Sequence, residues 1–254
     1  MKVIPIGRFK PYRFAIFERF PEVHACVSTR HSTVPEPNPV RRRRINLPEE
    51  ERRERYFRSE KQWYNALHIP VDHIARIHQV HGDHIVHARQ PGILGEGDGI
   101  VTNLKNLYLR VVTADCLSVF IYDPCAKAIG LVHAGWRGLC NNVIGKTIEK
   151  MQKLFNSKPR NLIIAIAPFI QACCYTVKED VAGKFSSESL GSINNGAYKL
   201  DMGNAAGKQL ALLKIPHLNI EIASECTYCR DDLFYSARRD KLRTGRNVSI
   251  VGLQ

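Results

Sequence analysis

Three residues of metal-binding types, one cysteine and two histidines, lie at the ends of apolar runs in the sequence. His81 follows the run that ends at Val80, and Cys116 and His133 flank apolar segments within the stretch from Thr113 to Gly138. A strand end holds a side chain on rigid backbone, so these three side chains are placed to converge at one edge of a sheet. Two imidazoles and one thiolate would leave the fourth position of a tetrahedral zinc ion to water, as in catalytic rather than structural zinc sites.

Each of these residues also has a simpler interpretation. Cys116 would serve as a nucleophile with His133 as its base, which is the arrangement of a cysteine hydrolase. A single histidine is more often a surface or hydrogen-bonded core residue than a metal ligand. Histidines are concentrated between His68 and His87, but abundance says nothing about geometry. The metal hypothesis therefore depends on whether the three residues meet in the fold.

Two aspartates and two arginines complete the candidate chemistry. Asp98 lies in a glycine turn and Asp115 precedes Cys116. Either carboxylate is placed to polarise a neighbouring group. As simpler alternatives, Asp98 would only shape its glycine turn, and Asp115 would only orient a ligand or cap a strand end. Near the C-terminus, Arg238 and Arg246 lie in a hydroxyl-rich segment. Their guanidinium groups would bind phosphate, and a basic surface turn is the alternative interpretation.

A second cysteine motif competes for a metal ion. Cys226 and Cys229 have the CxxC spacing, which is half of many structural zinc sites and also a redox motif. No second CxxC occurs in the sequence, and the adjacent pair Cys173 and Cys174 has a different spacing. The spacing therefore favours structural or incidental cysteines.

Apolar runs and turn residues predict the elements that must position these side chains. Extended segments are expected at 14–17, 23–30, 73–80, 84–88, 100–102, 107–112, 117–122, 128–132, 162–167, 220–223 and 248–253, and helices at 49–67, 144–155, 178–190 and 204–213. The glycines between residues 91 and 99 predict a loop. No internal repeat or shift in composition marks a boundary, so the sequence predicts one α+β domain over residues 1–254.

The composition indicates the class of protein. The 254 residues are enough to bury a large core, and eight cysteines spread along the chain without a signal peptide indicate reduced thiols in a cytoplasmic protein. No run approaches the ~18 apolar residues that span a bilayer, so neither export nor membrane insertion is expected.

The net charge of +13 suits partners such as nucleic acid, acidic membranes or phosphorylated small molecules. Part of this charge lies in the tract from Arg41 to Arg44, within a proline-rich segment, 32–48, that is predicted to be an irregular surface loop. A short basic tract without interleaved aromatic residues is more typical of a solvated loop than of a nucleic-acid site. An RNA-binding or partner-binding protein that uses this tract remains the non-enzymatic alternative.

Several short motifs, in this order, resemble those of one known family. They are QVHG at residues 79–82, GDGIVT at 97–102, TADCL at 113–117, HAGWRG at 133–138, and the C-terminal segments FYSARRD and TGR. In combination they resemble the YfiH-type laccase-domain family, whose members are also described as multifunctional purine nucleoside phosphorylases, polyphenol oxidases or peptidoglycan editing factors. The resemblance runs from about Thr29 to the C-terminus.

The resemblance implies a fold, a metal and a reaction. The fold is an α+β β-sandwich of mixed sheets flanked by helices, and the metal is a zinc ion held by His81, Cys116 and His133. The implied reaction is phosphorolysis of adenosine, inosine, guanosine and methylthioadenosine, with adenosine deamination as a further activity. Purine nucleosides and phosphate are then the partners, with Arg238 or Arg246 expected to bind phosphate.

Copper-dependent phenol oxidation is the main enzymatic alternative. Multicopper chemistry uses clustered imidazoles, commonly as HxH pairs, and the sequence contains no HxH. Only Met151 and Met202 are internal thioethers, so an axial copper ligand is not indicated by spacing. The sequence therefore favours zinc over copper.

Overall fold

The computed structural model describes all residues except 1, 4–9, 32–56, 58–59, 193–195 and 242–243. The predicted basic loop 32–48 and the first part of the predicted helix 49–67 lie outside the described residues. The remainder of that helix is present as α3 (Lys61–Ala66).

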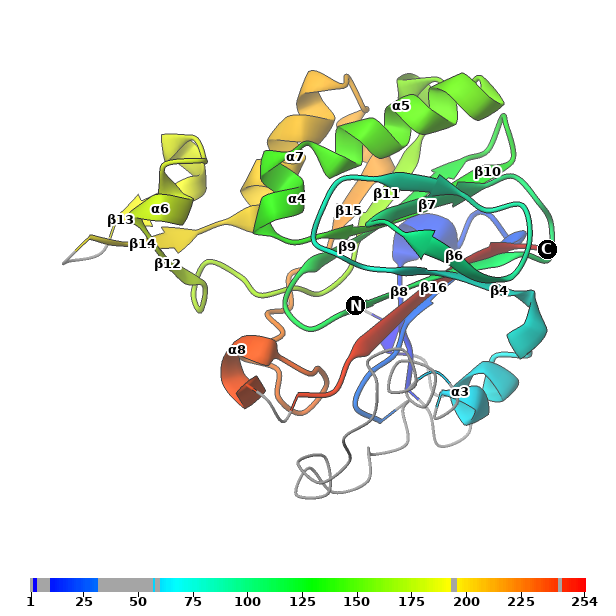
Figure 1. Ribbon diagram of the computed structural model, residues 1–254, viewed down its shortest axis with the longest axis horizontal. Coiled ribbons are helices and arrows are strands. Elements are labelled where there is room, and N and C mark those ends of the chain that lie inside the picture. The colour runs from blue at the N-terminus through cyan, green and yellow to red at the C-terminus, as the bar shows by residue number, and fades with distance from the viewer. Residues whose placement is uncertain (1, 4–9, 32–56, 58–59, 193–195, 242–243) are drawn as a thin grey trace.

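Two β-sheets pack face to face as a sandwich (Figure 1). In the described part of the chain, the first sheet contains, in spatial order, β1 (Lys2–Val3), β2 (Tyr12–Arg13), β3 (Val23–Val27), β16 (Asn247–Leu253), β8 (Tyr108–Thr113), β4 (Ile74–His78) and β6 (Gly92–Glu96). The second contains β15 (Ile220–Ile222), β11 (Ile163–Ile166), β9 (Leu117–Asp123), β10 (Ala128–Ala134), β7 (Gly99–Thr102) and β5 (Ile85–His87). Both sheets mix antiparallel pairs with parallel pairs.

The alternation of side chains along the central strands explains why both faces of the second sheet are buried. On β9, Phe120 and Tyr122 point into the core between the two sheets, whereas Val119 and Ile121 point into a second core under the helices. Successive side chains of a strand face opposite sides of the sheet, so an unbroken apolar run marks a strand covered on both faces. This pattern made the central strands predictable.

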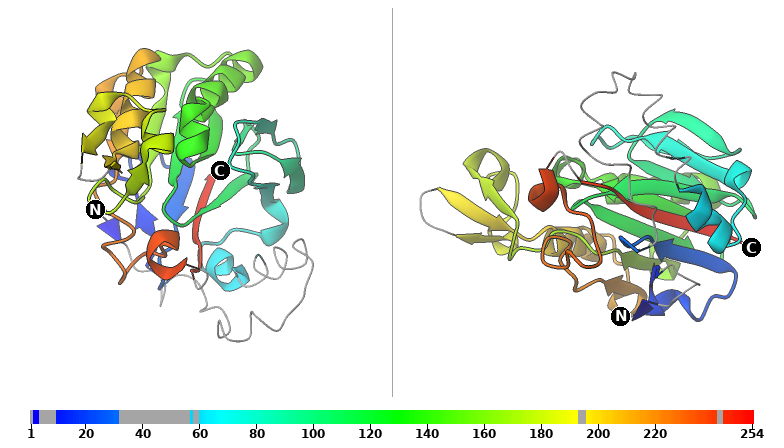
Figure 2. Two further views of the ribbon diagram at one scale, coloured as in Figure 1. Left: turned by 60° about the vertical axis from the view of Figure 1, so that its left-hand side comes forward. Right: turned by 90° about the horizontal axis from the view of Figure 1, so that it is seen from below.

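Helices cover the outer faces of the sandwich (Figure 2). Helices α4 (Trp136–Cys140), α5 (Val143–Phe155) and α7 (Met202–Leu212) lie on the second sheet. As the spacing predicts, α5 buries Ile144, Ile148 and Met151 on one face. On the other side, α3 packs Trp63 and Tyr64 against the first sheet.

A smaller unit extends from the side of the sandwich. The strands β12 (Thr176–Lys178), β14 (Ala197–Leu200) and β13 (Leu190–Ser192) form a third sheet beside α6 (Glu179–Ala182), at the left of Figure 1. The short helix α8 (Ala237–Asp240) precedes the last strand. Of the predicted helix 178–190, Glu179–Ala182 form α6, Ser187–Ser189 form a 3₁₀ turn and Leu190 begins β13.

Two further predicted elements differ from the structure. Residues 14–17, expected as a strand, form a 3₁₀ turn over Ala15–Phe17. Phe14 still packs on Phe120 with ring centroids 4.8 Å apart, so the apolar run reflects core packing rather than extended structure. The glycine-rich loop expected at 91–99 contains strand β6, which pairs in parallel with β4 at the edge of the first sheet.

The predicted α+β class, with mixed sheets flanked by helices, is confirmed. Among the described residues, we find no helix that is long and apolar enough to cross a bilayer. The extent of the domain, residues 1–254, stays a prediction.

Candidate metal centre

His81, Cys116 and His133 meet at one end of the second sheet. Cys116 directly precedes β9, and His133 lies near the end of β10, opposite Ser118 of β9. His81 comes from the loop between β4 and β5. The potential ligand atoms of the three side chains all lie within 4.8 Å of one another, and the two imidazole rings meet edge to face with centroids 4.8 Å apart. We call these residues the three-ligand centre.

The carboxylate of Asp98 holds the two histidines in place. Its oxygens accept hydrogen bonds from the backbone N–H groups of Val80, His81 and Gly82, at 3.3, 3.0 and 2.6 Å. The same carboxylate contacts His133 Nδ1 at 2.7 Å. His81 has a left-handed backbone conformation, with φ of 60°, which is uncommon for a residue with a side chain and must be stabilised by its surroundings. Asp98 therefore positions both histidines from one buried point.

The contact with Asp98 also determines which nitrogen of His133 faces the centre. Burial raises the pKa of Asp98, but its hydrogen bonds with His133, Gly82 and Val80 outweigh burial and lower it below the ordinary value. The ionised carboxylate accepts the Nδ1 proton, which leaves Nε2 to face a metal ion. Burial lowers the pKa of His133, but its bonds to Asp98 and Cys116 raise it to about 9.

The thiol of Cys116 is activated by its neighbours. Burial raises its pKa, but hydrogen bonds with His133 and His81 outweigh burial and bring the pKa to about 6. Cys116 is therefore a thiolate near neutral pH, which is the form that binds metal ions. Gly135 permits this packing, because a Cβ atom there would lie 3.1 Å from Cys116 Sγ and 3.5 Å from His81 Cδ2.

The donor set and its exposure fit a metal ion with one open position. One thiolate and two imidazoles are common zinc ligands, and a carboxylate bound to the far nitrogen of a ligating histidine is a frequent supporting contact. His133 is buried, Cys116 is half-buried and His81 is exposed. The centre is therefore reached by solvent from the side of His81.

Asp115 acts on the surrounding loops rather than on the three-ligand centre directly. Its carboxylate accepts a hydrogen bond from Thr227 Oγ1 at 2.7 Å and another from the backbone N–H of Arg238 at 2.7 Å. Asp115 itself has a φ of 97°. Two segments distant in sequence are thus tied to the residue that precedes Cys116.

Sequence reasoning missed Tyr175, which lies beside the centre. Burial raises the pKa of Tyr175 to about 12, with a further contribution from Cys116 and an opposing one from Arg238. The guanidinium carbon of Arg238 lies 5.1 Å from the centroid of the Tyr175 ring. Tyr175 is therefore a protonated phenol at neutral pH, able to donate a hydrogen bond. No spacing rule singles it out, because it follows a cysteine pair with no recognised motif.

The two arginines predicted to bind phosphate have different surroundings. Arg238 is exposed, and its Nη1 donates to the Thr176 carbonyl at 3.0 Å. The guanidinium has five N–H donors, so this bond occupies a small part of its capacity. Arg246 is half-buried, and its Nη1 donates to the Gly245 carbonyl at 2.9 Å. Arg238 is thus the better placed of the two for an anion beside Tyr175.

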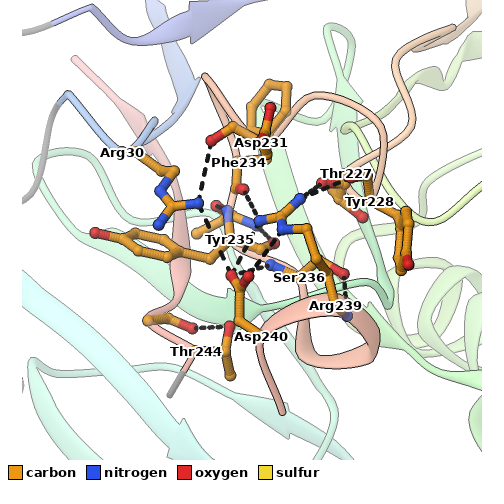
Figure 3. A network of polar contacts seen from close by, with 12 residues as sticks. Arg30, Thr227, Tyr228, Asp231, Phe234, Tyr235, Ser236, Arg239, Asp240 and Thr244 are labelled. Carbon is orange, nitrogen blue, oxygen red and sulfur yellow. Dashed lines mark hydrogen bonds and ion pairs between the residues drawn. The ribbon is translucent and has the colours of Figure 1, made fainter. Parts of the chain in front are cut away.

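Arg239, between the predicted arginines, has a structural role (Figure 3). Its Nε and Nη2 contact the carboxylate of Asp240 at 2.8 and 2.9 Å. Its remaining donors reach the carbonyls of Thr227, Tyr228 and Phe234, each at 2.8 Å. These bonds fasten the CxxC loop to α8.

The chain is similar to known proteins both in sequence and in fold. Residues 24–254 match the family model described as multi-copper polyphenol oxidoreductase laccase. The chain is 38% identical over 192 residues to a purine nucleoside phosphorylase of Deinococcus radiodurans, across 74% of this chain and 73% of that protein. It is 32% identical over 169 residues to purine nucleoside phosphorylase YlmD of Geobacillus stearothermophilus, across 64% of this chain and 60% of that protein.

A solved structure shares the fold. The hypothetical protein YfiH of Bacillus licheniformis superimposes with a TM-score of 0.82 at 27% identity, covering 93% of this chain and 95% of that one. The similarity therefore includes the sandwich, its flanking helices and the strands that carry the three-ligand centre.

Proposed function

This chain belongs to the family described as multi-copper polyphenol oxidoreductase laccase, and on that premise we propose that it is a zinc-dependent purine nucleoside phosphorylase. The names of its relatives support a phosphorylase-like enzyme with nucleoside and phosphate as substrates. The observation that carries the zinc part of the proposal is the convergence of His81, Cys116 and His133 within 4.8 Å. We further propose adenosine, inosine, guanosine and methylthioadenosine as substrates, with adenosine deamination as a second reaction.

The proposed reaction exchanges one bond at the sugar. A phosphate oxygen forms a bond to the anomeric carbon of the ribose while the bond from that carbon to the purine nitrogen breaks. The electron pair of the broken bond goes to the purine, which takes up a proton and leaves as the free base. A bound zinc ion would supply a Lewis acid beside Cys116.

The protein's own residues would orient the two substrates around that centre. Arg238 is proposed to bind phosphate, because its guanidinium is exposed and matches the geometry of phosphate oxygens. Arg246 is the second candidate for this role. Tyr175 would donate a hydrogen bond from the half-buried rim between Arg238 and Cys116. Asp98 holds His133 with Nε2 toward the centre, and Asp115 places the backbone of Arg238.

Zinc is preferred to copper for reasons of ligand type. The three-ligand centre mixes one thiolate with two imidazoles, a set that zinc accepts in a tetrahedral site with one open position. A blue-copper site adds a long axial thioether ligand. Met151 packs under the second sheet, where a Cβ atom on Gly130 would lie 3.2 Å from its sulfur. Copper in the purified protein, together with phenol oxidation, would favour the oxidase instead.

The predicted cytoplasmic location belongs to the same proposal. It rests on reduced cysteines, and all eight cysteines of the chain are free thiols in the structure. Free thiols are typical of reducing compartments. Cell fractionation with an antibody to the protein tests this location.

The test of function is phosphate-dependent release of free base from a panel of purine nucleosides, with metal content measured on the same sample. Base release that requires phosphate, together with zinc, supports the proposal. The test variant is Cys116→Ser, which keeps the size of the side chain but replaces the thiolate. Full activity in metal-free protein contradicts the role of zinc, and absence of turnover with every nucleoside contradicts the function.

A cysteine hydrolase is the second candidate, because Cys116, His133 and Asp98 also lie in the order nucleophile, base and orienting carboxylate. His81 distinguishes the two interpretations, since a hydrolase needs one imidazole on the thiolate and a metal centre needs both. Iodoacetamide should modify Cys116 slowly in zinc-loaded protein and rapidly after chelation. Formation of an acyl-enzyme on metal-free Cys116 would support the hydrolase.

A further inference from the structure

Four cysteines outside the three-ligand centre come together from two loops. Cys173 and Cys174 follow β11, and Cys226 and Cys229 follow β15. Strands β11 and β15 are parallel neighbours, so the loops that leave them start from the same edge of the sheet. The four sulfur atoms all lie within 4.8 Å of one another. We call these residues the four-cysteine cluster.

The sulfur separations fit one metal ion. The Cys174 and Cys229 sulfurs are 3.3 Å apart, those of Cys173 and Cys174 are 3.6 Å apart, and those of Cys173 and Cys229 are 3.8 Å apart. Four thiolates around one zinc at about 2.3 Å lie about 3.8 Å from one another in a tetrahedron. A disulfide needs only about 2.05 Å between its sulfurs. The cluster is therefore spaced for shared coordination rather than for covalent pairing.

The compactness of the cluster also argues against an iron–sulfur centre. An iron–sulfur cluster distributes its cysteines over separate iron atoms, which places some of the thiolates far apart. Here every pair of sulfurs is within the limit of 4.8 Å. A single ion bound by all four thiolates matches this spacing, and zinc is the usual ion of a closed tetrathiolate site.

Backbone contacts hold the cluster from both loops. Phe169 and Cys226 form an isolated parallel bridge, and the Thr227 N–H donates to the Phe169 carbonyl at 3.0 Å. The Gln171 N–H points to Cys226 Sγ at 3.4 Å. N–H groups directed at a thiolate sulfur are typical supporting contacts of metal-bound cysteine. The two loops are thus already joined at the cluster.

Two basic side chains bind backbone carbonyls of the loops that carry the cluster. Four thiolates and one zinc ion carry a net charge of two negative units. Lys199 Nζ donates to the Cys173 carbonyl at 2.9 Å. Arg239 donates to the carbonyls of Thr227 and Tyr228 between the two other cysteines. Both cations thus lie on the backbone of the cluster loops, where their charge would oppose that of a zinc tetrathiolate.

We propose that Cys173, Cys174, Cys226 and Cys229 bind a structural zinc ion, separate from the metal of the three-ligand centre. Binding replaces the protons of the cysteine thiols with the metal ion and releases those protons to solvent. The sequence contains no second CxxC motif. The fold supplies the missing pair of ligands as two adjacent cysteines.

The site fastens loops that border the three-ligand centre. Thr227, between Cys226 and Cys229, donates to the Asp115 carboxylate at 2.7 Å, and Asp115 precedes Cys116. Tyr175 directly follows Cys174 in the other loop. A zinc ion at the cluster would therefore hold both edges of the proposed substrate site without taking part in the reaction.

Zinc content of the full-length protein tests the proposal independently of any enzymatic activity. Wild-type protein should carry about two zinc ions per chain, and Cys229→Ser and Cys116→Ser should each carry about one. The double variant should carry about none. Cys125→Ser is the matched control, because Cys125 is exposed and belongs to neither group; it should keep the wild-type content.

Zinc X-ray absorption of the Cys116→Ser protein identifies the remaining ligands even if Cys229→Ser fails to fold. The proposal predicts a first shell of four sulfur atoms at about 2.3 Å. A shell that contains nitrogen or oxygen would overturn it, as would wild-type protein with no more than one zinc. In wild-type protein, fewer than eight reactive thiols after chelation and denaturation under argon would show that the cluster forms disulfides instead.

Discussion

The three-ligand centre and the four-cysteine cluster contain similar ligand types, but different backbone elements carry them. The first mixes nitrogen and sulfur donors from two strand ends and one loop of the sandwich, and its exposed side at His81 is open to solvent. The second uses sulfur alone, on two loops beyond the ends of parallel strands. An open coordination position allows a substrate to approach, whereas a complete ligand set excludes it. We therefore propose chemistry for the first region and a structural role for the second.

The supporting contacts differ in the same way. In the three-ligand centre, Asp98 binds His133 and three backbone N–H groups, including that of His81, whose φ is positive. The orientation of those ligands thus depends on one buried carboxylate. In the four-cysteine cluster, Cys226 is held by backbone contacts with Phe169 and Gln171. A structural metal site needs its ligands brought together, whereas a reactive metal site also needs each ligand oriented.

Replacement of Cys116 by serine should have the largest effect on activity. Loss of the thiolate removes the ligand between the two histidines, so base release should fall by at least about 10³-fold, the scale of losing a group that stabilises transition-state charge. The four-cysteine cluster should keep its zinc. Steady-state phosphorolysis and metal analysis check this. Near-normal turnover with one zinc fewer would contradict the assignment of the reaction to the three-ligand centre.

Replacement of Asp98 by asparagine should have the next largest effect. An amide NH₂ group would face N–H donors of Gly82, Val80 or His81, so the loop that carries His81 should shift. Zinc affinity at the three-ligand centre should fall by about 10–100-fold, which competition with a chromogenic chelator measures. Asp83→Asn, in the same loop but on an exposed ion pair with Lys146, is the control. Equal affinity in both variants would show that Asp98 does not position the ligands.

Replacement of Cys229 by serine should affect stability more than chemistry. The variant should lose one zinc ion and about 2–3 kcal/mol of stability, which corresponds to a decrease in Tm of roughly 5–10 °C. Base release should fall by less than about tenfold, since the three-ligand centre stays complete. Calorimetry and kinetics on the same preparation give both numbers. A loss of activity as large as that of Cys116→Ser would show that the cluster takes part in the reaction.

The smallest effect is expected from Thr227→Val, which separates the two regions. The variant loses the hydrogen bond to the buried Asp115 carboxylate, at a cost of about 1–2 kcal/mol. Zinc content should not change, and the Michaelis constant for phosphate should rise a few-fold because Arg238 is held by the same carboxylate. Thr227→Ser keeps the hydroxyl and should behave as wild type. An unchanged phosphate constant in the valine variant would remove this link between the regions.

The sequence predicts the parts of the molecule in which a local pattern and the fold agree. The apolar runs of β8, β9 and β10 are buried on both faces, so their composition alone marks them. Cys116 and His133 lie at strand ends, which are visible in a sequence, and His81 lies in the loop that follows β4. The structure brings the three together as expected. Their role in metal binding stays a prediction until the metal is measured.

The remaining features depend on contacts between distant segments. Asp98 contacts both histidines because its turn lies against the loop of His81 and the end of β10. Nothing in the sequence of the glycine turn indicates these two contacts. Cys173 and Cys174 meet the CxxC motif only because β11 and β15 are parallel neighbours. A search for ligand pairs at fixed spacing cannot detect such a site. Strand β6 formed from a glycine-rich segment because an edge position beside β4 was available.

Stepwise removal of zinc tests the central distinction most directly. A chelator added to wild-type protein should take the ion of the open three-ligand centre first, while the four-cysteine cluster retains its own. Phosphate-dependent base release should disappear as zinc content falls from about two ions per chain to about one. Activity that persists until the second ion is lost, or that survives complete removal of zinc, would contradict this distinction.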